Sequence, residues 1–194
     1  MDVSRDSLKL SFGQVAWAIS RGRTPDARTL DRLRYLRQLH VPFTEAERKG
    51  SGNRMVYRFE HLVECGLAYQ GHLRRLKPLD IAMAIGSERK RLRALARSIF
   101  DEIDPAEFRR VNDAWRKPTY DPMQERYVRF HDRDSQHPWT IEELTIAKDP
   151  ERELRTIFDV TRDDSVTDLI PLKNSIVSWV GWALVAPETR PGRP

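Results

Sequence analysis

The sequence predicts a mainly α-helical fold, with one β-hairpin in its first half and a smaller α+β or all-α second half. Three observations support this prediction. Apolar residues recur at helical spacing through most of the first half. A polar segment with two glycines, followed by strict alternation of side-chain type, interrupts them once. An almost wholly apolar segment of helical length occupies 168–186 near the other end.

The first helix is predicted over residues 11–20. Its apolar positions follow the i, i+3, i+4, i+7 spacing of an amphipathic helix, at Phe12, Val15, Ala16 and Ile19. Ser11 is a favourable N-cap, and Gln14 three residues later completes a capping box. The start of this helix is therefore well defined by local sequence.

The second helix is predicted over 25–39, after a basic turn at Arg21-Gly22-Arg23, with Thr24 as N-cap and Pro25 at its first position. One broad arc of this helix is apolar, at Leu30, Leu33, Leu36 and Leu39. The opposite arc is polar and strongly basic, at Arg28, Asp31, Arg34, Tyr35 and Gln38, with Arg32 at its edge. Arginine, glutamine and tyrosine side chains suit contacts with phosphates and base edges. The alternative interpretation of the same arc is an ordinary solvent-exposed helix surface with no binding partner.

A β-hairpin is predicted next. Lys49-Gly50-Ser51-Gly52 is a turn signal. Residues 54–59 then alternate, with Met55, Tyr57 and Phe59 on one side and a mostly basic outer face on the other. This alternation predicts the return strand of a hairpin.

The rest of the first half is predicted to be helical. One helix covers 60–73, and a short one begins at Pro78 and stops at Gly86. Ser87 caps a third, whose apolar seam over 88–103 suits core packing or a partner helix.

The second half gives weaker patterns. A helix is predicted from Asp104-Pro105 through Trp115, and another from Asp149-Pro150 toward Phe158. A loop at 117–126 and a strand at 127–131 lie between them, and 139–147 fits either a helix or a strand. The apolar helix at 168–186 is expected to be buried in a core or a dimer interface, and 189–194 to form a flexible tail.

The charge of the chain is unevenly distributed. The net charge is +5, with +8 in residues 1–103 and −3 in residues 104–194. This asymmetry favours a polyanionic partner for the first half. The single cysteine, Cys65, excludes an internal disulfide and a Cys-rich zinc site, and we expect it to be a small buried hydrophobe. No signal peptide and no membrane span are predicted, so we expect a cytoplasmic, nucleoid-associated protein.

The sequence offers no support for an enzyme. It contains no Gly-rich phosphate loop, no Gly-x-Ser-x-Gly elbow and no His-Glu-x-x-His. The five histidines lack the spacing of metal ligands, so neither a metal site nor a cofactor is expected.

The order of the predicted elements is that of a winged helix-turn-helix, and residues 11–86 resemble the N-terminal domain of MerR-type regulators. The resemblance rests on 11–16 for the opening helix and on Leu33-Arg34-Tyr35-Leu36-Arg37-Gln38-Leu39 for the recognition helix. It rests also on Gly52-Asn53-Arg54-Met55-Val56-Tyr57 for the wing and on 77–81 for the second wing helix. The resemblance implies a homodimer that binds double-stranded DNA. The family's Cys-rich metal loop has no counterpart here, so metal sensing is not implied.

The DNA-binding residues that we predict come from the second helix and the wing. The resemblance implies that Arg34 and Tyr35 contact the DNA backbone, and the alternative for Tyr35 is packing against the core. Lys49, Arg54 and Arg58 would give phosphate contacts of the wing. Sequence preference would come from Arg28, Arg32 and Gln38. The full predicted set is Arg28, Arg32, Arg34, Tyr35, Gln38, Arg48, Lys49, Asn53, Arg54 and Arg58.

We therefore predict a DNA-binding domain at 8–86, linking or dimerisation helices at 87–116 and a dimerisation or regulatory domain at 117–188. The first hypothesis is a homodimeric, sequence-specific transcriptional regulator. The second is an excisionase-like architectural or recombination-directing factor. The third is a protein-interaction adaptor that uses the winged domain on an acidic partner.

Overall fold

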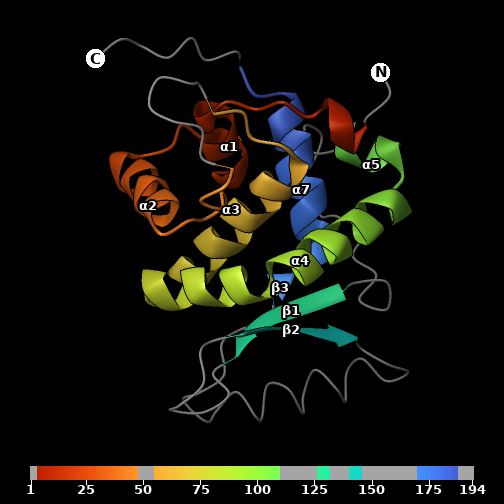
Figure 1. Cartoon of the computed structure of the whole chain (residues 1–194). Helices are drawn as coiled ribbons and strands as arrows, with labels where there is room; N and C mark the ends of the chain where they lie inside the picture. The colour runs from red at the N-terminus through yellow and green to blue at the C-terminus, as the bar shows by residue number, and fades with distance from the viewer. Residues whose placement is uncertain (1–3, 48–54, 110–125, 132–139, 146–169, 188–194) are drawn as a thin grey trace.

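The computed structural model describes residues 4–47, 55–109, 126–131, 140–145 and 170–187. The described fold is mainly helical, as the sequence predicts, and its small antiparallel sheet lies in the second half of the chain and not at the predicted wing (Figure 1). A short 3-10 turn, η1 (Arg5–Ser7), precedes the first helix.

Helix α1 (Phe12–Ile19) begins where its capping box predicts. The backbone N–H of Gln14 donates to Ser11 Oγ at 3.2 Å, and the N–H of Ser11 donates to Gln14 Oε1 at 2.9 Å. Two otherwise unpaired donors at the helix start are thereby satisfied within four residues of sequence.

Helix α2 (Ala27–Gln38) begins two residues later than predicted. Its N-cap is Asp26 and not Thr24, because the Asp26 carboxylate accepts the N–H of Thr29 at 2.7 Å. A carboxylate at this position also interacts favourably with the helix dipole. The backbone bond, with a further side-chain bond from Thr29, keeps the pKa of Asp26 below its usual value.

The predicted return strand of the wing, 54–59, is wrong as a strand: among its described residues, 55–59, only Tyr57 is in a β-bridge, and the end of the segment is helical. Phe59 is the first residue of α3 (Phe59–Leu73), because the N–H of Arg58 donates to Nδ1 of His61 and so caps a helix start. Tyr57 makes a single antiparallel bridge with Leu10, with N···O distances of 2.8 and 2.9 Å. Residues 48–54, which would form the turn of the hairpin, lie outside the described residues.

Three successive helices end in the same way, in a Schellman motif with a non-glycine residue in the left-handed conformation. These residues are Arg21 (φ 54°) after α1, His40 (φ 64°) after α2 and Arg75 (φ 65°) after α3. After α2, for example, the N–H of Val41 donates to the carbonyl of Leu36 at 3.0 Å. Glycine is the usual residue at such positions, so each turn holds a locally unfavourable backbone conformation.

Helix α4 (Pro78–Glu102) is continuous, and the predicted break at Gly86 is wrong. Its buried stripe passes the glycine without a change of phase, at Ile81, Ala84, Ile85, Leu92, Leu95, Ala96 and Ile99. One glycine costs a helix only about 1 kcal/mol, which this burial outweighs. Ser87 donates from its hydroxyl to the carbonyl of Ala84 at 3.1 Å instead of capping a new helix.

The sheet has the strand order β2-β1-β3 and lies against α4 (Figure 1). Strand β1 (Arg126–His131) confirms the strand predicted at 127–131, and β2 (Thr140–Thr145) resolves 139–147 as a strand. They pair antiparallel with Val128 opposite Glu143, and β1 also pairs with the two-residue β3 (Ile170–Pro171). Short α5 (Pro105–Arg109) starts the helix predicted from 104. Its predicted continuation to Trp115, most of the 117–126 loop, the helix at 149–158 and the tail at 189–194 lie outside the described residues.

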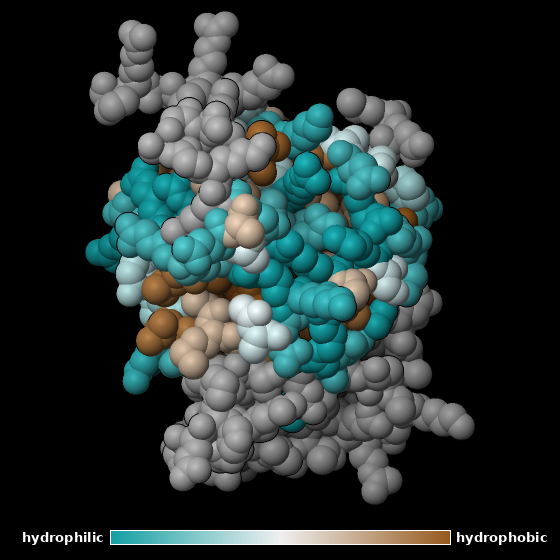
Figure 2. Space-filling view, in the orientation of Figure 1, coloured by the Kyte–Doolittle hydropathy of each residue, from teal (hydrophilic) through white to brown (hydrophobic). Residues whose placement is uncertain are grey.

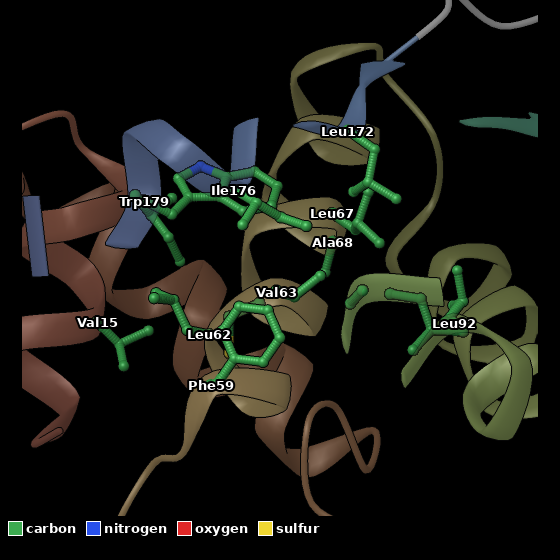
Figure 3. Packing of buried hydrophobic residues seen from close by; sticks show 14 of the residues in the cluster. Val15, Phe59, Leu62, Val63, Leu67, Ala68, Leu92, Leu172, Ile176 and Trp179 are labelled. Atoms are coloured by element: carbon green, nitrogen blue, oxygen red, sulfur yellow. The ribbon is translucent and has the colours of Figure 1, made fainter. Parts of the chain in front are cut away.

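Helix α7 (Leu172–Leu184) is shorter than the predicted 168–186 and is buried in the core of this chain. In Figure 3, Trp179 and Ile176 extend from α7 over Leu62 and Leu67 of α3, with Val15 of α1 beside them. The core thus draws on both the predicted DNA-binding domain and the predicted C-terminal domain. Among the described helices, none combines the length and the apolar character that a membrane span requires.

Candidate nucleic-acid interface

The candidate interface is the solvent-facing side of α2, which we call the outer face of α2: Arg28, Asp31, Arg34, Tyr35 and Gln38. All five side chains are exposed, while Thr29, Leu33 and Leu36 on the other side are buried. Helical periodicity places them so, because positions three and four apart share a face. Helix α2 lies at the edge of the helical layer, on the far side of α3 from α7, and its surface is hydrophilic (Figures 1 and 2).

Two features hold the inner side of α2 in place. The hydroxyl of buried Thr29 lies 3.4 Å from the hydroxyl of Tyr69 on α3. The guanidinium of Arg37 lies over the ring of Phe12 on α1, 5.8 Å from its centroid. Arg37 therefore faces the protein, unlike the arginines of the outer face.

Arg34 and Asp31 form an ion pair on the outer face, with 2.8 Å between Arg34 Nη1 and Asp31 Oδ1. Both side chains are more than half exposed, so water screens the pair and it contributes little to stability. Such a pair exchanges readily for a bond from Arg34 to a phosphate. The carboxylate of Asp31 also lowers the positive potential of the outer face.

Arg32 lies on the flank of α2 and not on the outer face. It is half-buried and lines a hollow of ≈ 20 Å³ with Tyr35, Leu36, His72, Pro78 and Ile81. Burial lowers the pKa of His72, and the nearby Arg32 guanidinium lowers it further. The hollow has room for about one water, so it is no ligand pocket.

The wing residues are only partly placed. Arg48, Lys49, Asn53 and Arg54 lie outside the described residues. Arg58 is exposed directly before α3, on a different element from the outer face of α2. Its neighbour Val56 is also exposed, at 48%.

A network of ion pairs that the sequence did not predict joins α4 to α3. Arg89, Arg93 and Arg97 project from α4 at i, i+4 and i+8 toward glutamates of α3 and of the loop after α2. Arg89 and Arg93 both bind Glu64, Arg97 binds Glu60 at 2.7 Å, and Arg93 also binds Glu47 at 3.0 Å. The complementary spacing of Glu60 and Glu64, four residues apart on one helix, was the available signal. These arginines therefore contribute to the basic first half without adding a free cationic surface.

The titrating groups of this network respond to burial and to their partners. Burial raises the pKa of Glu47, but hydrogen bonds from Arg93 and from Thr44 outweigh it and lower the pKa to about 2. For Glu64, burial raises the pKa against the opposing effect of Arg89 and Arg93. Burial lowers the pKa of His61, although Glu47 opposes this, with Oε1 3.5 Å from His61 Nε2.

The other candidates for reactive chemistry among the described residues are Cys65 and the side chains of metal-binding type. Burial raises the pKa of the Cys65 thiol, and a protonated, enclosed thiol is a poor nucleophile. Within the described ranges, no three His, Cys, Asp or Glu side chains come together as a metal site would require. Comparison with known proteins gives no further information: no protein-family model matches the chain, and no curated protein matches it.

Proposed function

We propose that the protein is a sequence-specific, double-stranded-DNA-binding transcriptional regulator of winged helix-turn-helix type, acting as a homodimer in the cytoplasm on the nucleoid. The observation that supports this most directly is the outer face of α2. It presents two arginines, a tyrosine and a glutamine to solvent on the helix that follows α1 in the chain, after the connection 20–26. Residues 21–40 hold six arginines against two aspartates, which favours an anionic partner.

In this proposal α2 enters the major groove. Arg34 releases Asp31 and takes a phosphate, while Arg28 and Gln38, ten residues apart along the same face, reach base edges. Each bidentate base contact would contribute about 1–3 kcal/mol of discrimination. Each phosphate contact would add about 0.9 to the slope of log affinity against log salt. Arg58 and the predicted wing residues Arg48, Lys49, Asn53 and Arg54 would bind the neighbouring backbone.

The test is selection of bound sequences from a random duplex pool, followed by titration at about 50 and 200 mM salt. We expect an enriched inverted repeat with half-sites about one helical turn apart. Arg34→Ala should weaken binding to every duplex and reduce the salt slope by about 0.9. Lys90→Ala is the matched control, because it removes one positive charge from an exposed position on α4.

Two results would contradict the regulator. Binding without sequence enrichment, with a steep salt dependence and side-by-side cooperativity, would indicate the excisionase-like architectural factor. No binding to any duplex at low salt would exclude DNA as the partner of α2. A native circular-dichroism spectrum for each variant separates these results from misfolding.

One observation favours a second candidate function, the protein-interaction adaptor. Apolar side chains reach the surface at the start of α4, where Leu79 is 56% and Met83 is 45% exposed (Figure 2). They are four residues apart and therefore share a face of the helix. An adaptor would keep its function when the outer face of α2 is altered and lose it on Leu79→Ser with Met83→Ser, measured by partner pull-down.

A further inference from the structure

A buried carboxylate on α3 organises two arginines of α4. The side chain of Glu64 is 2% exposed, and each of its oxygens accepts from a different arginine. Arg93 Nε donates to Oε1 at 2.6 Å, and Arg89 Nε donates to Oε2 at 3.1 Å. A carboxylate so deeply buried is tolerated only when it is paired, so the two guanidinium groups are held in fixed positions.

Both arginines use their other nitrogens on the segment that directly follows α2. Arg89 Nη2 donates to the carbonyl oxygen of His40 at 2.5 Å. Arg93 Nη2 donates to the carbonyl oxygen of Pro42 at 3.2 Å, and Arg93 Nη1 donates to Glu47 Oε1 at 3.0 Å. Each arginine therefore bridges α3 to the end of the proposed recognition helix.

The contacted segment is one that needs external support. His40 occupies the left-handed position of the Schellman motif after α2, where a residue with a Cβ is unfavourable. Glu47 also accepts the N–H of Thr44 at 2.8 Å and so ties the far end of the segment. The network thus binds the segment 40–47 near both of its ends, through the carbonyls of His40 and Pro42 and the side chain of Glu47. This segment lies between α2 and the predicted turn of the wing.

We propose that Arg89 and Arg93 are positioning residues of the DNA-binding surface: anchored on Glu64, they fix the segment 40–47 and thereby set DNA affinity without contacting DNA. The inference rests on the proposed function of α2. Their side chains are only 14% and 20% exposed, and the bonds just described use Nε and Nη2 of Arg89 and all three nitrogens of Arg93. A lysine could not replace either one, because a single ammonium cannot reach the carboxylate and the carbonyl in a fixed fork.

Substitution of two acidic residues of the same loop tests the inference, because positioning and charge predict opposite changes in DNA affinity for one of them. Glu47→Ala removes the bond of Arg93 to the side chain at the far end of the segment, whereas Glu45→Ala removes an equal charge from an exposed side chain two residues earlier. If the loop acts through charge alone, both variants bind DNA more tightly. Positioning requires Glu47→Ala to weaken binding by about tenfold, through a lower population of the binding-competent arrangement, with the salt slope unchanged. Glu45→Ala should not weaken it.

Arg93→Lys supplies a second variant, since it keeps the charge and loses the fork. It should weaken binding as Glu47→Ala does, whereas a phosphate contact would survive the exchange. Hydrogen exchange at the amide of Val41, which donates to Leu36, should accelerate in both variants in the absence of DNA.

The possible failures are distinguishable. Binding by the wild type, with Glu47→Ala equal to Glu45→Ala in affinity and in Val41 exchange, overturns the positioning role alone. Absence of binding by the wild type overturns the proposed function, and with it any role of these arginines toward DNA.

Discussion

The indole of Trp179 on α7 lies directly over the backbone of Gly66 on α3. A Cβ built on Gly66 would lie 2.5 Å from Cε2 and Cζ2 of the ring, closer than real Cβ contacts. Trp179 is 3% exposed and is surrounded by other core residues, so its indole cannot move away from an added Cβ without disturbing the core. The absence of a side chain at residue 66 thus allows α7 to approach α3.

Gly66→Ala should destabilise the protein by about 1–3 kcal/mol, because overpacking outweighs the helix propensity that alanine gains. Gly86→Ala is the matched control, since residue 86 is also inside a helix but nothing lies within 4 Å of its added Cβ. That variant should be more stable by about 0.5–1 kcal/mol. Denaturant unfolding of both variants measures the difference, and equal shifts would show that α7 does not pack as described.

His40→Gly should stabilise the protein by up to about 1 kcal/mol, because glycine adopts the left-handed conformation without steric cost. Its side chain is exposed, so the exchange removes no core packing. Lys90→Gly, in the regular part of α4, should instead cost about 1 kcal/mol. Thermal or denaturant unfolding distinguishes them, and a destabilised His40→Gly would refute the conformation assigned to residue 40.

Asp31→Asn should increase DNA affinity by roughly twofold, because it frees Arg34 and removes a negative charge from the outer face of α2. Glu88→Gln provides a closely matched comparison. Glu88 pairs with Arg91 at the same i, i+3 spacing and the same 2.8 Å distance, but on α4. Its loss should leave the affinity unchanged, and a similar gain in both variants would mean that overall charge governs binding and α2 has no special role.

Acidification should destabilise the wild type relative to His61→Gln. Burial lowers the pKa of His61 below its usual value of 6.5, so the unfolded chain takes up a proton there before the folded one does. The stability that depends on neutral His61 is present above pH 6.5 and is lost as the pH falls through that value. Burial likewise lowers the pKa of His72, so His72→Gln reports the other contribution in this range.

Denaturant unfolding at several values between about pH 8 and pH 5 tests this pH dependence. The advantage of the wild type over His61→Gln should be constant down to about pH 6.5 and shrink below it, as the unfolded chain takes up the proton first. A constant difference would show that His61 titrates alike in the folded and unfolded chains.

The features that the sequence predicts well are those with local causes. The capping box of Ser11 and Gln14 lies within four residues, and the exposure of Arg28, Arg34, Tyr35 and Gln38 follows from helical periodicity alone. The continuity of α4 was missed because one glycine is a weak breaker when the buried stripe continues on both sides of it.

The features that it predicts poorly depend on contacts far apart in the chain. The pairing of Arg89 and Arg93 with Glu64 was not predicted, because a sequence displays charges and not their partners, and Glu64 lies 25 and 29 residues away. The flank position of Arg32 depends on its neighbours in the hollow, His72 near the end of α3 and Pro78 at the start of α4. The apolar character of α7 predicted burial, but not that α1 and α3 would cover it.

The position of α7 near the C-terminal end has a consequence for the order in which parts of the chain can fold. Helix α1, which packs against α7, precedes it by about 150 residues in the sequence. Contacts between residues so far apart in sequence form slowly. Until α7 arrives, the apolar surfaces of Val15 and Leu62 lack their cover and are open to chaperones or to aggregation. The core beneath the proposed DNA-binding helices is therefore completed only by a helix from the other end of the chain.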